Sequence, residues 1–596
     1  GWQRFQWHFG AVLPLKAGRH RLRWTNLKGG GINFDAFCLT DDPDYVPKGT
    51  KLSSPAKGYH LIVVQAETFT KSRGKQLTVN RPRVYDRLSF PKEAVRAWEQ
   101  SPEKELHIFP AWGWVNSINR IARIDEKTCT IYLDPPCQAD LRPGNRFFVA
   151  NVREALDSPG EFYLDRSTGV LTCWPEDENF MQQEVVAPAM KRIVFFRGDG
   201  PKRRVEHIEF RGLTFRDTQY TVDIASLYYP PDGAICMQDA ADNRIEGCTF
   251  ELLGGWALVG VGATDKNLFV GNTVRYVGQG GVFLCGQTFP DRLIIGDDPE
   301  RGGFKLPGKR PVGSGPTGNL ISGNHIHHIG LTYAHVAGFY AETAHENIIS
   351  HNFIHDTPRY GISLKRKCRG NRIEFNEVRR TNLETNDTGA IETYTTTTPN
   401  LINNNLIVDS IGLKVTEDLQ WHSPFYSWGI YLDGYSSNIT VTNNICLRNV
   451  LGGIMFNGGW NCRIENNIFA DGRDHLIYLN NYLGKFHGSK MLRNIIYTDL
   501  KPPGSVRVTR WDPKLDFLID YNLYWTGTGK PPEITAAPWD KWRSWGFDKH
   551  SLVADPLFVD VSKEDFRLKP NSPALKLGFK PIDVSRIGLR GYVPPP

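Results

Sequence analysis

A five-residue phrase that begins with glycine and ends on a polar residue recurs along the chain, as in Gly429-Ile-Tyr-Leu-Asp433. If the residue after each glycine faces inward on a β-strand, the fourth residue after it faces outward, because side chains alternate between the two faces. Strands stacked about 4.8 Å apart would align these outward residues. The resulting column is Glu342, Lys365, Thr393, Asp433 and Asn457. Such a ridge suits a bound sugar chain, although the exterior of any solvent-facing strand is polar.

Aromatic residues gather beside this column in the sequence. Trp421 and Trp428 belong to a loop, residues 419–428, and Tyr431 lies within the glycine phrase that follows it. Planar rings can cover the C–H faces of sugars, whereas core packing is the alternative for any single aromatic residue. We therefore expect the following substrate-contacting set: Glu342, Lys365, His335, His355, Trp421, Trp428, Tyr431 and Asn457.

Hydrolysis of a glycosidic bond needs two carboxyl groups, about 5 to 5.5 Å apart for retention or about 6.5 to 9.5 Å for inversion. Two acidic positions stand out on successive repeats, Asp387 and Asp433. In the glycine alignment Asp387 precedes its glycine by two residues and Asp433 follows its own by four. Straight strands would hold them about 20 Å apart. Either the strand bends at Asp387, or the alignment through Gly389 is shifted.

Several histidines fall on adjacent repeats, so we considered whether they form a metal site. They are His325, His327, His328, His351 and His355. A metal site needs at least three such ligands in tetrahedral reach, with further partners that orient them. Histidines at surface turns are more often hydrogen-bonded to backbone, so we expect no metal.

An asparagine phrase, Asn-apolar-Ile-x-x-Asn-x-Ile, predicts the elements that must position these groups. It recurs from Asn319 to Asn467 in steps of 24 to 38 residues, which suits one coil of a parallel β-helix. Asparagine tolerates the left-handed backbone of a sharp turn, and stacked amides can bond to one another. Frequent glycine and β-branched residues argue against a helical solenoid. The expected asparagine column is Asn272, Asn324, Asn352, Asn376, Asn405, Asn443 and Asn467.

Composition narrows the function classes. The chain has 596 residues, and 71 Lys and Arg against 64 Asp and Glu give a net charge of +7 that is spread along the sequence. This falls short of a nucleic-acid-binding footprint. No apolar run of about twenty residues predicts a membrane span. Ten scattered cysteines show neither metal-ligand spacing nor a C-x-x-C pair, so a disulfide framework is not expected.

The chain divides into five predicted segments. Residues 1–48 are expected to be the last strands of a β-sandwich like those of carbohydrate-binding modules. Residues 49–105 are expected to form a connecting segment and the start of the β-helix. Short alternating strands predict a small inserted β-domain at 106–178. Coils follow at 179–550, beginning near Val205, and 551–596 is expected to cap the open edge of the last coil. Because the chain starts without Met and shows no signal peptide, we expect it to be truncated or processed.

Several phrases are more specific than generic β structure. They include Phe109-Pro-Ala-Trp-Gly-Trp-Val-Asn116, Asn145-Arg-Phe-Phe-Val-Ala-Asn151 and Gly169-Val-Leu-Thr-Cys-Trp-Pro175. With the coils, they resemble the secreted right-handed parallel β-helix enzymes of glycoside hydrolase family 141 and the related family 120. The resemblance runs from about residue 105 to the C-terminus. It implies a bacterial polysaccharide hydrolase that is secreted or periplasmic. We expect it to need no cofactor and to be a monomer.

The resemblance also assigns catalytic residues. The phrases that carry the proposed catalytic aspartates of family 141 correspond to Asp387 and Asp433, while many relatives have Tyr where this chain has Glu392, which makes Glu392 a rival acid. The expected substrate is a complex plant or algal polysaccharide. Two alternatives stay open: a polysaccharide lyase with Lys365 as base and Arg359 or calcium neutralising a uronate carboxylate, and a non-catalytic glycan-binding solenoid.

Overall fold

The computed structural model describes residues 12–16, 20, 36–47, 52–65, 84–90, 103–137, 139–219, 232–286, 315–416 and 418–595. The chain forms two compact units, residues 1–83 and 84–596. In the first unit β1 (Ala36–Thr40) pairs antiparallel with β2 (Leu61–Gln65). Most of the predicted β-sandwich fragment at 1–48 lies outside the described residues. Within the described part of the chain, no helix is long and apolar enough to cross a membrane.

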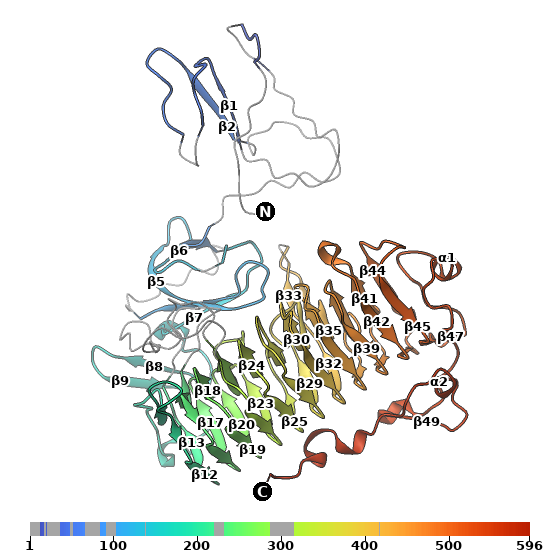
Figure 1. The fold of residues 1–596 in the computed structure, drawn as a ribbon. Coiled ribbons are helices and arrows are strands. Elements are labelled where there is room, and N and C mark those ends of the chain that lie inside the picture. Colours follow the sequence, from blue (N-terminus) through green and yellow to red (C-terminus); the bar gives the residue numbers. More distant parts are fainter. Residues whose placement is uncertain are drawn as a thin grey trace. The chain divides into compact units, whose positions relative to one another are not determined.

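The second unit is built around three long parallel sheets, so the predicted all-β, parallel β-helix fold is confirmed (Figure 1). We name the sheet with the glycine phrases the site sheet. Its strands are β10 (Val194–Arg197), β14 (Gly233–Gln238), β18 (Trp256–Val261), β21 (Val282–Cys285), β24 (Ala337–Glu342), β27 (Tyr360–Leu364), β30 (Thr388–Tyr394), β35 (Ser427–Asp433), β38 (Ile454–Asn457), β41 (His475–Asn480) and β44 (Ser505–Thr509). The first coil thus begins at Val194, ahead of the predicted Val205.

The other two sheets complete each coil. The middle sheet contains β12 (Glu209–Arg211), β16 (Arg244–Glu246), β19 (Leu268–Val270), β22 (Leu320–Ser322), β25 (Ile348–Ser350), β28 (Arg372–Glu374), β31 (Asn400–Asn403), β36 (Ile439–Thr442), β39 (Arg463–Glu465), β42 (Ser489–Leu492) and β45 (Phe517–Asp520). The tail sheet contains β13 (Thr214–Arg216), β17 (Thr249–Leu253), β20 (Thr273–Val277), β23 (His325–Ile329), β26 (Phe353–His355), β29 (Glu377–Thr381), β32 (Leu406–Ser410), β37 (Ile445–Leu447), β40 (Ile468–Ala470), β43 (Ile495–Tyr497), β46 (Leu523–Trp525) and β47 (Leu552–Val553).

Aliphatic side chains fill the interior of the coils. Ile326, Ile354, Val378 and Ile407 are register partners on consecutive strands of the tail sheet, and each is fully buried or nearly so. Since alternate strand positions face inward, the β-branched residues of the asparagine phrase stack into one continuous core. Each coil covers its neighbours, so this core lengthens with every coil that is added.

Asparagine side chains form two ladders at the corners of the coils. In the longer one, each side-chain amide donates to the Oδ1 of the next: Asn272, Asn324, Asn352, Asn376, Asn405, Asn444, Asn467, Asn494 and Asn522. A second ladder joins Asn243, Asn267, Asn319, Asn347, Asn371 and Asn400. The prediction of Asn443 as a ladder member was wrong by one residue. The left-handed residue directly precedes the ladder asparagine. It is Asn404, one residue before the predicted Asn405, and Asn443, where the prediction of a left-handed backbone was right.

A small antiparallel sheet precedes the coils. It has the order β3 (Arg87–Ser89), β6 (Thr130–Leu133), β5 (Ser117–Asp125), β4 (Glu105–Ile108) and β7 (Phe147–Ala150), and it buries its own apolar cluster, which includes Leu106, Ile108 and Ile131. The hairpin β8 (Phe162–Asp165) and β9 (Val170–Cys173) follows. The segment is stabilised by its own core, separate from that of the coils.

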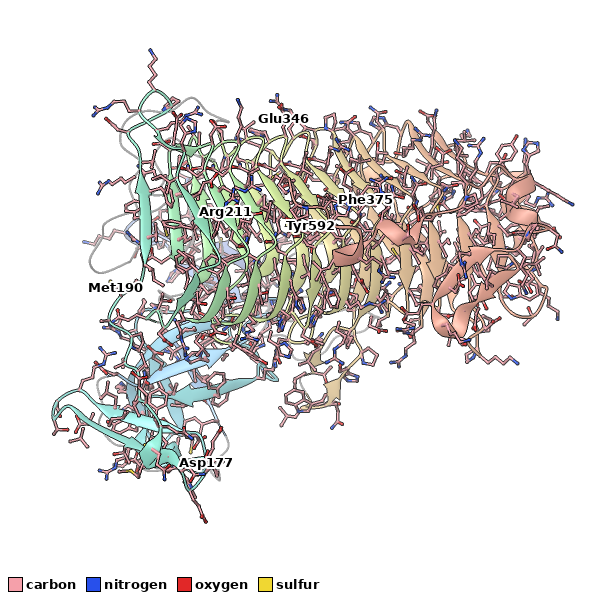
Figure 2. All side chains as sticks on the ribbon, turned by 90° about the horizontal axis from the view of Figure 1, so that it is seen from below. Asp177, Met190, Arg211, Glu346, Phe375 and Tyr592 are labelled. Atoms are coloured by element: carbon pink, nitrogen blue, oxygen red, sulfur yellow. The ribbon has the colours of Figure 1, made fainter. Side chains whose placement is uncertain are left out.

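The last coil and the C-terminal segment differ from the prediction of a simple cap. Helix α1 (Trp539–Ser544) places the buried Trp542 in the main core, and β47 pairs with β46. Beyond β47 the chain runs back along the tail sheet through β48 (Phe558–Asp560), η6 (Val561–Lys563), β49 (Asp565–Leu568), α2 (Pro573–Lys576), η7 (Val584–Arg586) and η8 (Gly588–Gly591) (Figures 1 and 2). We name residues 554–595 the tail. It reaches the early coils, where Arg244 donates to the carbonyl of Pro595 at 2.6 Å.

Candidate active site

The register of the site sheet corrects the predicted exterior column by one residue. Tyr394, rather than Thr393, is the register partner of Asp433, and Thr393 pairs with the inward-facing Leu364 and is fully buried. In the coil of β30, Gly389 therefore lies five positions before the column residue, Tyr394, whereas Gly429 lies four positions before Asp433. The exterior column is Glu342, Lys365, Tyr394, Asp433 and Asn457.

Strand β30 bends, and the bend brings Asp387 over the site sheet. The Thr388 hydroxyl donates to Glu392 Oε2 at 3.2 Å, although a straight strand would separate residues four apart by about 13 Å. A Cβ added at Gly389 would lie 2.7 Å from the Cβ of Tyr431, so only glycine fits this close approach. The Tyr431 hydroxyl then donates to Asp387 Oδ1 at 3.3 Å. The alignment through Gly389 is also shifted by one residue, but this shift lengthens the predicted offset of about 20 Å, so only the bend accounts for the approach of Asp387 to Asp433.

Asp387 is a partly exposed carboxyl group in an unfavourable place for a negative charge. Burial raises its pKa to about 7, the charge of Asp433 and then that of Glu392 act in the same direction, and Arg359 opposes them. A carboxyl group of this kind holds a proton near neutral pH, as a general acid must.

Asp433 is held as an acceptor. Its Oδ1 receives the backbone N–H of Gly434 at 2.6 Å and the amide of Asn457 at 2.7 Å. Asn457 in turn accepts from Asn480 at 2.7 Å, which fixes the direction of its amide. Burial and then the charge of Glu392 raise the pKa of Asp433, while the hydrogen bond from Asn457 opposes the rise. Asn457 thus orients Asp433, and its predicted contact with substrate stays a prediction.

Lys365 and Glu392 form a buried ion pair beside the two aspartates. Glu392 is 3% exposed, and the Lys365 ammonium also donates to the Tyr360 hydroxyl at 3.1 Å. Burial disfavours the charged amine, but the carboxylate of Glu392 outweighs it and the pKa of Lys365 is raised. The pair leaves neither group free for proton transfer.

The small β-domain contributes a wall beside Asp387 that the sequence did not predict. The Arg359 guanidinium donates to the carbonyls of Trp114 at 2.6 Å and Asn386 at 3.1 Å. The amide of Asn386 donates to the carbonyl of Trp112 at 3.2 Å. His335 packs against the Tyr360 ring with centroids 5.6 Å apart, and burial holds its pKa well below the usual value. Backbone carbonyls make these contacts, so no residue type signalled them.

A groove of about 390 Å³ opens between this wall and a hairpin on the coils. Its lining comes from residues 109, 111–113, 142–146, 413–416 and 418. The hairpin is β33 (Lys414–Val415) with β34 (Trp421–His422). The half-exposed Trp112 ring lies 3.7 Å from the guanidinium carbon of Arg142, which presents a flat aromatic and cationic surface.

The predicted aromatic contacts separate into two groups. Trp421 is 65% exposed on the hairpin, where a sugar can reach it. Trp428 and Tyr431 are 0% and 4% exposed and pack with Val450, Leu451 and Met455, so the prediction that their ring faces stack on sugar was wrong. Tyr431 acts through its hydroxyl on Asp387 instead.

Two other predicted contacts, Glu342 and His355, differ from the prediction in burial and in position. Glu342 is buried, with an oxygen 3.6 Å from Arg366. His355 belongs to β26 of the tail sheet, whereas Asp387 and Asp433 belong to the site sheet. Its assignment to the sugar site was therefore wrong.

Comparison with known proteins adds little. No family model matches the chain, and no curated protein matches it. Among solved structures it is similar to a glycoside hydrolase at 17% identity, with 62% of this chain and 71% of that chain covered and a TM-score of 0.45. A mutant of the periplasmic alginate epimerase AlgG is similar at 15% identity, with 54% and 70% covered and a TM-score of 0.36. The complex of XylC with xylose is similar at 15%, with 59% and 54% covered and a TM-score of 0.29.

The chain is thus a parallel β-helix protein whose site sheet carries interacting carboxyl groups beside a groove. The resemblance to families 141 and 120 stays a prediction.

Proposed function

We propose that the protein is a glycoside hydrolase that cleaves a complex plant or algal polysaccharide. The observation that carries this proposal is the pair Asp387 and Asp433, whose environments differ. Asp387 has a pKa raised to about 7 by burial and by the neighbouring acid charges, whereas Asp433 is held by N–H donors. Glycosidic cleavage requires one carboxyl group that gives a proton and one that acts as a carboxylate, and the N–H donors on Asp433 favour its charged form.

In this mechanism Asp387 is the general acid. It gives its proton to the glycosidic oxygen as the bond between that oxygen and the anomeric carbon breaks and the electron pair moves to the leaving oxygen. Asp433 acts on the anomeric carbon, either directly as nucleophile or by taking a proton from an attacking water. Asn457 and the Gly434 N–H stabilise its negative charge and point its free oxygen away from them.

Glu392 has a positioning role in this proposal. Its ion pair with Lys365 and its hydrogen bond from Thr388 support the bend that brings Asp387 over the site sheet. Its charge also contributes to the raised pKa of Asp387.

The groove and the hairpin favour an extended substrate. Trp112 and Trp421 both present exposed ring area near the groove and the hairpin that borders it, and sugar units beyond the cleaved bond could stack there. A polysaccharide of this size is met outside the cytoplasm, so we propose a secreted or periplasmic location.

A panel of purified polysaccharides tests the proposal. Release of reducing ends without ultraviolet absorbance from a new carbon–carbon double bond would support hydrolysis. Appearance of that absorbance would instead establish a lyase, and binding without any turnover would establish a glycan-binding solenoid.

Variants of Lys365 give a second test between the hydrolase and the lyase mechanisms. A lyase base must be unprotonated, and the ion pair with Glu392 weighs against this. Lys365→Met leaves a buried carboxylate unpaired and should cost about 3 kcal/mol of stability. The double variant Lys365→Met, Glu392→Met should recover much of that stability. If the double variant folds and keeps turnover above the level of Asp433→Asn, Lys365 is not the base.

A further inference from the structure

A compact group of histidines lies on the exterior of the tail sheet, on a different sheet from the acids. We name His325, His327, His328, His355 and Asp356 the histidine cluster. His327 and His355 are register partners on β23 and β26, with parallel rings 4.8 Å apart. His328 and Asp356 follow them at equivalent corners of successive coils, both with a left-handed backbone (φ 49° and 51°). The fold therefore stacks these groups across two coils.

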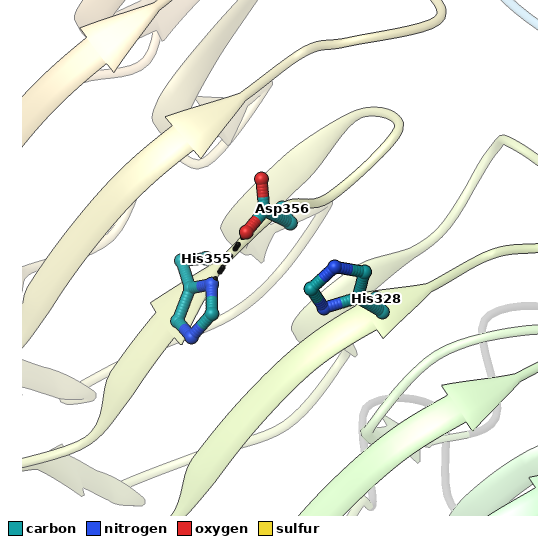
Figure 3. A group of neighbouring side chains, drawn as sticks. All are labelled: His328, His355 and Asp356. Atoms are coloured by element: carbon teal, nitrogen blue, oxygen red, sulfur yellow. Dashed lines mark hydrogen bonds and ion pairs between the residues drawn. The ribbon is translucent and has the colours of Figure 1, made fainter.

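The hydrogen bonds of the cluster fix where its lone pairs are. His355 Nδ1 lies 2.7 Å from Asp356 Oδ2, and because the carboxylate accepts, this nitrogen carries the proton (Figure 3). His355 Nε2 then offers a lone pair, and it faces His325 Nε2 at 2.9 Å. A metal ion would take the place of this proton, because His355 Nδ1 and Asp356 Oδ2 point toward each other and can both bind one ion once the nitrogen is deprotonated.

The geometry points to a site for a divalent transition-metal ion, with zinc as the reference, held by His328, His355 and Asp356. One ligand atom from each of the three lies within 4.8 Å of the others, and Figure 3 shows the three side chains converging from two coils. Zinc takes nitrogen and oxygen ligands at about 2.0 to 2.2 Å, so modest side-chain rotations close the site. His325 Nε2 lies 2.9 Å from His355 Nε2 and holds the other edge of that ring in place.

The charges around the cluster are compatible with a cation. Arg275 is paired with Glu251 at 2.8 Å, and Arg379 is paired with Glu564 at 2.7 Å, so these neighbours in the His327 and His355 column are neutralised. Arg380 donates to Asp356 Oδ1 at 2.6 Å and holds the carboxylate in place. The ion would join two coils of the solenoid, and its effect would be on stability rather than on the reaction.

Zinc titration of the untagged full chain tests the site, after treatment with a chelator and dialysis. Isothermal titration calorimetry should give one equivalent of zinc, and His328→Ala and His355→Ala should each weaken binding at least tenfold. The matched control is His550→Ala. His550 Nδ1 lies 2.6 Å from Asp520 Oδ2, the same histidine–carboxylate contact, but among the described residues no other group of three metal-ligating side chains forms around it. This control should bind zinc as the unaltered chain does.

A melting experiment keeps the test independent of any folding defect. Zinc should raise the melting temperature of the unaltered chain and of His550→Ala, because an ion that binds only the folded state stabilises it. It should not raise that of His355→Ala or of the milder His355→Gln. The proposal is overturned if zinc does not bind, if it binds the His355 variants with unchanged affinity, or if His550→Ala loses binding equally, which would indicate adsorption to surface histidines.

Discussion

At the scale of single residues, Asp387 combines two opposed requirements. Its position beside the β-domain wall limits its contact with water, and burial with the charge of Asp433 raises its pKa to about 7. The same environment that makes it a proton donor makes its ionised form costly to the fold. Function and stability therefore conflict at this residue.

Replacement of either aspartate by asparagine should abolish most turnover. Asp387→Asn and Asp433→Asn keep the side-chain shape but remove proton transfer or negative charge, so kcat should fall by about 10²-fold or more. Steady-state rates on the polysaccharide identified by the panel measure this. Glu392→Gln is the comparison: if it alone is inactive while Asp387→Asn turns over normally, the acid is Glu392 and the assignment fails.

The pH dependence of stability gives a second test of Asp387. Its pKa is higher in the folded state than in the unfolded chain, so its stabilising contribution is complete below the unfolded pKa and is lost as pH rises through about 7. Asp387→Asn cannot ionise. Its melting temperature should therefore exceed that of the unaltered chain increasingly between about pH 4 and pH 7, and by a constant amount above that. An equal difference at every pH would contradict the assignment.

Trp421 and Trp428 should respond oppositely to replacement by alanine. Trp421→Ala removes an exposed ring, so KM should rise while the free energy of unfolding changes by no more than about 0.5 kcal/mol. Trp428→Ala empties a buried site and should cost about 3 to 5 kcal/mol. Urea denaturation with parallel kinetics separates the two effects. Loss of stability without a change in KM at Trp421 would remove it from the substrate path.

At the scale of elements, the asparagine ladder allows a comparison between adjacent residues. Asn444 accepts from Asn405 and donates to Asn467 and to the Ile402 carbonyl, all in the interior. Asn444→Ala leaves these buried groups unpaired and should cost roughly 3 kcal/mol. Asn443→Gly, at a φ of 56° that suits glycine, should cost far less. Equal urea midpoints for the two variants would contradict the ladder.

The fold could be predicted from the sequence because every coil repeats the same pattern of asparagine and β-branched residues. Many copies of the phrase give a similar spacing, so the length of one coil was well determined. Single-residue placement was not: an insertion before Asn444 and the bend at Gly389 each shifted one coil by a residue. A strand shifted by one residue exchanges its faces, which is why Thr393 was placed outside and Tyr394 was missed.

The candidate site was predicted only in part for the same reason. Asp387 and Asp433 were predicted from a family phrase, and their spacing left two alternatives open, a bent strand at Asp387 or a shifted alignment. Burial of Trp428 and Tyr431 was also hidden, because an aromatic residue beside a polar column has the same sequence signature whether it faces solvent or packs under a loop.

At the scale of the whole molecule, the tail covers an apolar exterior that the coils cannot bury themselves. On the later strands of the tail sheet, Leu406, Val408, Ile445 and Leu447 pack against the tail. The tail contributes Phe558, Phe566, Ala574, Phe579 and Ile587 to this second core.

Truncation after Ala554 should therefore expose a continuous apolar surface. We expect a lower melting temperature, binding of a hydrophobic dye and a tendency to associate. Phe566→Ala is a milder version and should cost about 3 kcal/mol or more. A truncated chain with unchanged melting temperature and no dye binding would show that the tail is dispensable.

The longer asparagine ladder also gives the solenoid an electrical direction. Every side-chain amide in it donates toward the following coil, so the small dipoles add along the axis and polarise one another. The donor end of the row, at Asn522, meets the buried carboxylate of Asp548, which also accepts from Trp542 in α1 and from the Tyr524 hydroxyl. An acceptor at the positive end of aligned dipoles is favourable, as it is at the start of a helix. Helix α1, which closes the last coil, is thus bonded through Trp542 to the carboxylate that accepts from the donor end of the ladder.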